Sequence, residues 1–164
     1  MRPLILLALA LSFPTFAAAQ ETPPPVETCG ATDAALPAGL APWRTPTPVA
    51  GVVRPGTTAQ VTLRPIAEVH VAIPPHPARD GGATTGATLD LEIATAGTYQ
   101  ILLSEGAWVD LVQAGTALRS SAHGHGPGCS TIRKTVDFTL APGRYVIQLS
   151  GTTAAGARLL VIPR

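Results

Sequence analysis

The sequence predicts an all-β protein, an antiparallel β-sandwich of jelly-roll type with eight or nine strands. Three observations lead to this prediction. Short apolar runs alternate with polar residues at a period of two, which is the pattern of half-buried strands. Turn signals separate these runs about every ten residues, as in a sandwich. The chain holds 17 prolines and 16 glycines, and it shows no long helical pattern.

The first nineteen residues have the three parts of a secretory signal peptide. Met1-Arg2 is a short basic start, an apolar run follows over 4–11, and Ala17-Ala-Ala19 is a small-residue cleavage site. The apolar run is shorter than the roughly 20 residues that cross a bilayer. We therefore expect a periplasmic or secreted protein with no membrane span in the mature chain. Its expected parts are a signal peptide over 1–19, an extended N-terminal segment over 20–45 and a β-sandwich domain over 46–164.

The low charge of the chain argues against nucleic acid as a partner. The formal net charge is +1, charged residues make up 13% of the chain, and Lys134 is the one lysine. Binding to nucleic acid requires a basic patch that neutralises phosphates. We therefore expect no nucleic-acid partner, and a carbohydrate or a protein as the unknown ligand.

Two cysteines, Cys29 and Cys129, occur in a chain that carries an export signal. An even number of cysteines in an oxidising compartment predicts a disulfide bond. A bond that closes a loop of about 100 residues contributes up to about 4–5 kcal/mol in the chain-entropy model.

The N-terminal half contains the less regular elements. Residues 31–43 are broken by two prolines, and we expect Trp43 to anchor this irregular segment on the core. A short edge strand is expected within 46–53. Alternation then predicts strands over 59–63 and 69–73. Prolines at positions 74, 75 and 77 end the second of these, because proline has no N–H to donate to a neighbouring strand.

The C-terminal half is the more regular. Strands are expected over 89–93, 99–103, 108–112, 132–140, 145–149 and 158–162, most of them bounded by glycine or proline turns. Large apolar residues occupy the inward positions of each strand. Two carboxylates, Asp110 and Asp137, lie on such strands, and we expect both to be solvated.

The loop over 121–130, with the sequence SAHGHGPGCS, is the first candidate site. His123 and His125 project to the same side if the backbone is extended. Cys129 adds a thiolate if it is not in a disulfide, and His70 or His76 could arrive from another strand. Imidazole and thiolate suit zinc, copper or iron, so a metal site is one interpretation of this loop.

The other interpretation is structural. If Cys129 pairs with Cys29, the sulfur is not a ligand, and the glycines serve a tight turn. The histidines are then ordinary loop residues, and we expect no cofactor. Ser120 and Ser121 lack the G-x-S-x-G setting of a hydrolase nucleophile, so no catalytic residue is assigned. Arg133-Lys134 beside the loop is expected to be a surface feature.

Several phrases in the C-terminal half are similar to a known family. They are AGTYQILL over 96–103, AWVDLV over 107–112 and FTLAPGRYVIQLSG over 138–151. Residues 87–162 resemble the bacterial pre-peptidase C-terminal domain, a small jelly-roll sandwich of secreted proteins. The resemblance implies a fold and scaffold residues, and it implies no catalytic ones.

The loop H-G-H-G-P-G-C over 123–129 carries a second resemblance. The mature chain looks like a group of small exported bacterial proteins with an H-G-H-G-P-x-C loop, some of them labelled homogentisate 1,2-dioxygenase. The larger enzymes of that name hold iron with two histidines and a glutamate. Here the match covers His123 and His125, and Cys129 stands where the glutamate is expected.

We therefore expect an exported, non-catalytic binding or envelope-associated module. The alternatives are a metal-dependent enzyme, a dioxygenase if the label applies, and a metal-binding protein without turnover. Both alternatives use His123 and His125.

Overall fold

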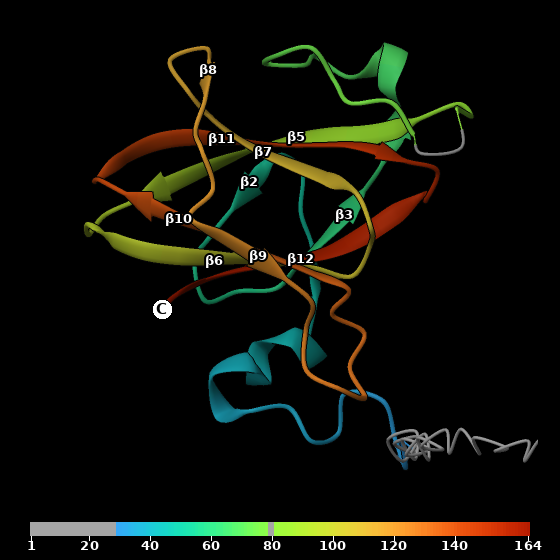
Figure 1. Cartoon of the computed structure of the whole chain (residues 1–164), viewed down its shortest axis with the longest axis vertical. Coiled ribbons are helices and arrows are strands. Elements are labelled where there is room, and N and C mark those ends of the chain that lie inside the picture. The colour runs from blue at the N-terminus through green and yellow to red at the C-terminus, as the bar shows by residue number, and fades with distance from the viewer. Residues whose placement is uncertain (1–28, 79–80) are drawn as a thin grey trace, which may run out of the picture.

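Two β-sheets stacked face to face form the body of the protein in the computed structural model, which describes residues 29–78 and 81–164 (Figure 1). Most strand pairs are antiparallel, so the predicted β-sandwich is confirmed. The expected signal peptide and residues 20–28 lie outside the described residues. Within the described ranges, the structure has no helix of the length and apolar character that a membrane crossing needs.

The first sheet has the strand order β1-β3-β12-β6-β10-β9. Its bounds are Thr47–Pro48 for β1, Ala59–Thr62 for β3, Gly156–Pro163 for β12, Gly97–Leu103 for β6, Lys134–Leu140 for β10 and Ala122–Gly124 for β9. All neighbours pair antiparallel except β1 and β3. The histidine-containing loop therefore begins as an edge strand.

The second sheet has the order β2-β5-β11-β7-β8, and β4 also pairs with β5. Its bounds are Val52–Val53 for β2, Thr85–Ile93 for β5, Gly143–Thr152 for β11, Trp108–Gln113 for β7, Thr116–Ala117 for β8 and Arg64–Pro65 for β4. Two short strands, β1 and β2, lie where one edge strand was expected within 46–53, and β4, β8 and β9, of two or three residues each, were not predicted. Strands that short leave no alternating pattern in the sequence.

One core fills the space between the sheets. From β5 to β12 the chain passes repeatedly from one sheet to the other, as in a jelly roll. Alternate residues of each long strand therefore face the same interior. The predicted inward sets are buried: Leu89, Leu91, Ile93, Tyr99, Ile101, Leu103, Val136, Phe138, Leu140, Tyr145, Ile147 and Leu149.

A second, smaller core lies on the outer face of the first sheet. Ala38–Arg44 forms a 3-10 helix, η1, where an extended segment was expected. Trp43 is fully buried and packs with Leu102 and Leu160 of the sheet and with Ile132, which precedes β10. The prediction that Trp43 anchors the N-terminal segment is therefore confirmed.

The strand predicted over 69–73 is wrong. After the short 3-10 helix η2 (Ile66–Glu68), residues 69–78 have no regular secondary structure. We call this segment the strap, because hydrogen bonds described below attach it to the outer face of the second sheet. Its alternating residues fitted a strand, but the strap takes its hydrogen bonds from side chains of β11 instead of from a neighbouring strand.

Candidate functional site

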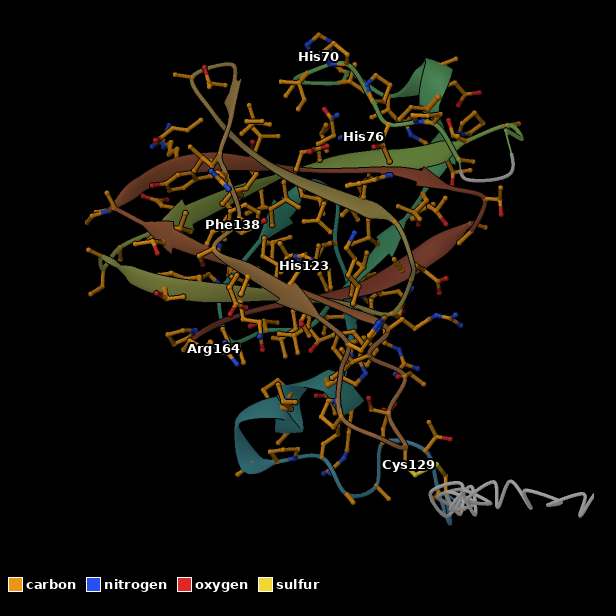
Figure 2. The ribbon with its side chains drawn as sticks, in the orientation of Figure 1. His70, His76, His123, Cys129, Phe138 and Arg164 are labelled. Atoms are coloured by element: carbon orange, nitrogen blue, oxygen red, sulfur yellow. A yellow bond between two sulfur atoms is a disulfide. The ribbon has the colours of Figure 1, made fainter. Side chains whose placement is uncertain are left out.

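The loop over 121–130 is fixed to the N-terminal segment by a covalent bond. Cys129 is joined to Cys29 in a disulfide, with the two Cα atoms 5.3 Å apart, and this confirms the predicted pairing (Figure 2). The condition under which Cys129 was predicted to bind a metal is therefore not met. Its sulfur is already bonded.

Hydrogen bonds reinforce that attachment. The carboxylate of Asp33 accepts hydrogen bonds from the N–H of Thr131 at 2.7 Å and from its hydroxyl at 2.6 Å. The same hydroxyl oxygen accepts the indole N–H of Trp43 at 2.8 Å. Arg158 lies 3.4 Å from the Asp33 carboxylate. The end of the loop is thus held in one position relative to η1 and the first sheet.

A groove of about 410 Å³ runs beside the loop on the outer face of the first sheet. Its floor consists of outward-facing side chains of β6 and β10, which are Gln100, Leu102, Thr135 and Asp137. Residues 122–127 form one wall. Leu40 of η1 and Arg164 complete the lining.

Asp137 is the buried charged group of this groove, with 3% of its surface exposed. Gln100 donates its side-chain N–H to Oδ1 at 2.8 Å, and Arg164 donates to Oδ2 at 2.6 Å. The expectation of a solvated carboxylate at Asp137 is therefore wrong. Its position does face outward, but the loop and the C-terminal arginine cover the sheet at this point.

Both predicted histidines are exposed at the loop wall. The Nδ1 atom of His125 lies 3.0 Å from the backbone carbonyl of Arg133. His70 and His76 belong to the strap over the second sheet and do not approach His123 (Figure 2). Among the described residues, no three of His, Cys, Asp and Glu gather where they could hold a metal ion.

The remaining candidates near the loop have structural contacts. The hydroxyl of Ser121 donates to the backbone carbonyl of Asp137 at 3.2 Å, and no hydrogen bond to a histidine is seen. The ammonium of Lys134 donates to the carbonyl of Ala107 at 2.8 Å, so Lys134 is not a plain surface residue. Arg133 is exposed, as expected.

The strap is a feature that the sequence did not reveal. Gln148 of β11 is fully buried, and its Oε1 accepts the N–H groups of Ala72 at 2.8 Å and Ile73 at 3.2 Å. Its Nε2 donates to the carbonyl of Ile73 at 3.0 Å. Further along, the hydroxyl of Ser150 accepts the N–H of His76 at 3.1 Å. Side chains of β11 therefore satisfy backbone groups that a strand would have paired.

The end of the strap is held by an aromatic contact. The ring of His76 stacks on Trp108, with centroids 4.3 Å apart. Its Nε2 lies 3.4 Å from the carboxylate of Asp110, whose side chain is 14% exposed rather than solvated as expected. The ammonium of Lys134 lies 5.0 Å from the centroid of Trp108. Trp108 is thus engaged by two partners, although 45% of its surface remains exposed.

Gln100 and Arg164 are the groove residues that the sequence did not predict. Gln100 is an outward residue of an ordinary strand, and Arg164 follows the last strand. Gln100 lies within the phrase over 96–103 but was not singled out there, and Arg164 belongs to no motif. The cross-strand pairing of Asp137 with Gln100 is what brings the side chains of Asp137 and Gln100 together on the sheet.

No protein-family model matches the chain, and no curated protein matches it. The pre-peptidase C-terminal domain of collagenase from Bacillus anthracis is a solved structure with 15% sequence identity to this chain and a TM-score of 0.42. That match covers 70% of this chain and 96% of the collagenase domain. At this identity it identifies no ligand and no site residue here.

Proposed function

We propose that this protein is an exported binding module, periplasmic or secreted, that holds a neutral carbohydrate in the groove beside the 121–130 loop. The observation that carries the proposal is the state of Asp137 in the floor of the groove. Its carboxylate is buried, and Gln100 and Arg164 already engage its two oxygens. The arginine balances the acid, so this pair gives the floor no net charge.

The lining suits a small molecule with many hydroxyl groups. Its volume, about 410 Å³, lies in the range of about 300–1,000 Å³ that is typical of small-molecule sites. The Gln100 amide, the Thr135 hydroxyl and the exposed guanidinium of Arg164 offer donors and acceptors. Ala122 and Pro127, both exposed in the wall, offer apolar surface for the C–H face of a sugar ring.

The groove is also rigid on the side of the loop. The disulfide fixes Cys129, and the Asp33–Thr131 hydrogen bonds fix the residues that follow. A preformed wall lowers the entropy that binding must overcome, which raises affinity for a given set of contacts. Export agrees with the signal-peptide pattern and with the disulfide, because such bonds persist in oxidising compartments.

No catalytic role is assigned in this proposal. Of the groups near the groove, Ser121 donates to a backbone carbonyl, and Asp137 is paired with Arg164. Neither is placed as a nucleophile with an adjacent base.

The test is isothermal titration calorimetry with a panel of neutral tetrasaccharides of glucose, galactose and N-acetylglucosamine. Ala122 lines the groove and is exposed, so Ala122→Trp fills the groove without disturbing the core. Ala117→Trp, at an exposed position of β8, is the matched control. We expect one class of sugar to bind the native protein and the control but not the groove variant. Absence of binding across the panel, or equal binding by Ala122→Trp, would refute the proposal.

A further inference from the structure

His123 lies in the edge strand β9, and His125 follows directly after the end of that strand. Gly124 and Gly126 face the outer side of the first sheet, where Thr135 and Ile132 lie. A Cβ atom on Gly124 would lie 3.5 Å from the hydroxyl of Thr135, and one on Gly126 would overlap the side chain of Ile132. Because successive side chains of an extended chain alternate, the two histidines face away from those contacts together.

The spacing of the two rings is suitable for chelation. Positions two apart in a strand are about 7 Å apart along the chain. Two imidazoles that start from that separation can converge on one ion with metal–nitrogen distances of about 2.0–2.1 Å. Both residues are exposed, so an ion from solution can reach them.

The hydrogen bond of His125 prepares its other nitrogen for a metal. Nδ1 lies 3.0 Å from the carbonyl oxygen of Arg133, which can only accept a hydrogen bond. In the neutral ring Nδ1 therefore carries the proton, and the lone pair is on Nε2. A backbone carbonyl bound to the distal ring nitrogen is the usual outer-shell arrangement of metal-binding histidines.

The cation next to the loop has contacts of its own. Lys134 lies in β10 one position before Thr135, the partner of Gly124. Its ammonium donates to the carbonyl of Ala107 and lies over the Trp108 ring, both in or beside β7 of the second sheet. Lys134 pairs with the core residue Leu103, so its side chain lies on the side of β10 opposite to the groove floor, where these two contacts engage its ammonium.

We propose that His123 and His125 together form a binding site for a late first-row transition-metal dication, with Cu²⁺ as the ion of highest affinity. The described residues supply two ligands, and Cys129 is in a disulfide, so water or an external ligand completes the coordination. Nitrogen ligands bind Cu²⁺ more tightly than Ni²⁺ or Zn²⁺ at a site of unspecialised geometry. The site is separate from the sugar proposal, because His123 pairs with the core residue Val136 and its side chain therefore lies on the side of β9 opposite to the groove floor.

The four histidines of the chain provide a matched test. Cu²⁺ is titrated into the mature protein by calorimetry, and electron paramagnetic resonance reports the number of nitrogen ligands. The variants are His123→Ala, His125→Ala and both together, with His70→Ala as the control, since His70 is exposed on the strap. Far-UV circular dichroism confirms that each variant is folded.

We expect one Cu²⁺ per chain with two imidazole nitrogens. Affinity should fall on the order of 10-fold or more in each single loop variant and remain unchanged in His70→Ala. Ca²⁺, which prefers oxygen ligands, should not compete. Unchanged affinity in the folded double variant would overturn the proposal, as would a spectrum without nitrogen coupling. A protein that binds Cu²⁺ but none of the sugars would leave this inference standing and remove the proposed function.

Discussion

His76 stacks on Trp108 with the two ring planes inclined by 20° and the centroids 4.3 Å apart. The contact joins the end of the strap to the first residue of β7. Asp110, on the same strand, lies 3.4 Å from Nε2 of the same imidazole. A histidine flanked by prolines therefore attaches the strap to the second sheet.

His76→Ala should loosen the strap. Loss of the ring contact is expected to lower the free energy of unfolding by about 0.5–1.5 kcal/mol, as for other aromatic pairs. Urea unfolding measures this change. His70→Ala, at an exposed residue of the same segment, should have no measurable effect. Equal stabilities for the two variants would show that the stacking does not hold the strap.

Gln148→Leu should free the middle of the strap. The fully buried amide makes three hydrogen bonds to the backbone of Ala72 and Ile73, and leucine makes none. We expect faster hydrogen exchange at those two amides and a loss of about 1–3 kcal/mol in stability. Gln113→Leu, at an exposed glutamine of β7, is the control. Unchanged exchange in Gln148→Leu would contradict the observed hydrogen bonds.

Replacing both cysteines by serine should destabilise the protein strongly. The disulfide spans 100 residues, and the chain-entropy model assigns such a loop about 4–5 kcal/mol as an upper figure. Urea unfolding of the double variant and of the reduced native protein should give the same midpoint, below that of the oxidised protein. An unchanged midpoint would mean that the hydrogen bonds of Asp33 alone hold the N-terminal segment.

Gly126→Ala should strain the histidine loop. The added methyl group would overlap both the side chain and the carbonyl oxygen of Ile132, which belongs to the smaller core. We expect a loss of about 1–3 kcal/mol, as for other overpacked sites. Gly106→Ala is the control because nothing lies within 4 Å of its added Cβ. If both variants unfold at the same temperature, the loop is looser than the structure indicates.

Residue patterns predicted the regular part of the fold well. Alternation identified the inward residues of the long strands, because one face of each strand is buried against the other sheet. The disulfide followed from two cysteines and an export signal, and Trp43 was identified as an anchor. These predictions depend on local pattern or on simple counting.

The strap and the groove could not be predicted in the same way. Residues 69–73 alternate like a strand, but their backbone partners are side chains of β11 some 75 residues later in the chain. Asp137 was expected to be solvated because it faces outward, yet Gln100 and Arg164 enclose it. Both errors concern the outer faces of the sheets, where tertiary contacts and not periodicity decide which residues are covered.

The sugar-binding groove is tested most directly by locating the bound ligand on the protein. The ¹⁵N–¹H correlation spectrum of the mature protein would be recorded during titration with each neutral tetrasaccharide of the panel. We predict chemical-shift changes confined to amides of residues 122–126 and of the groove floor, at Gln100, Leu102, Thr135 and Asp137. Changes centred on the strap or on β7, or no change with any sugar, would contradict the assignment of the groove as the binding site.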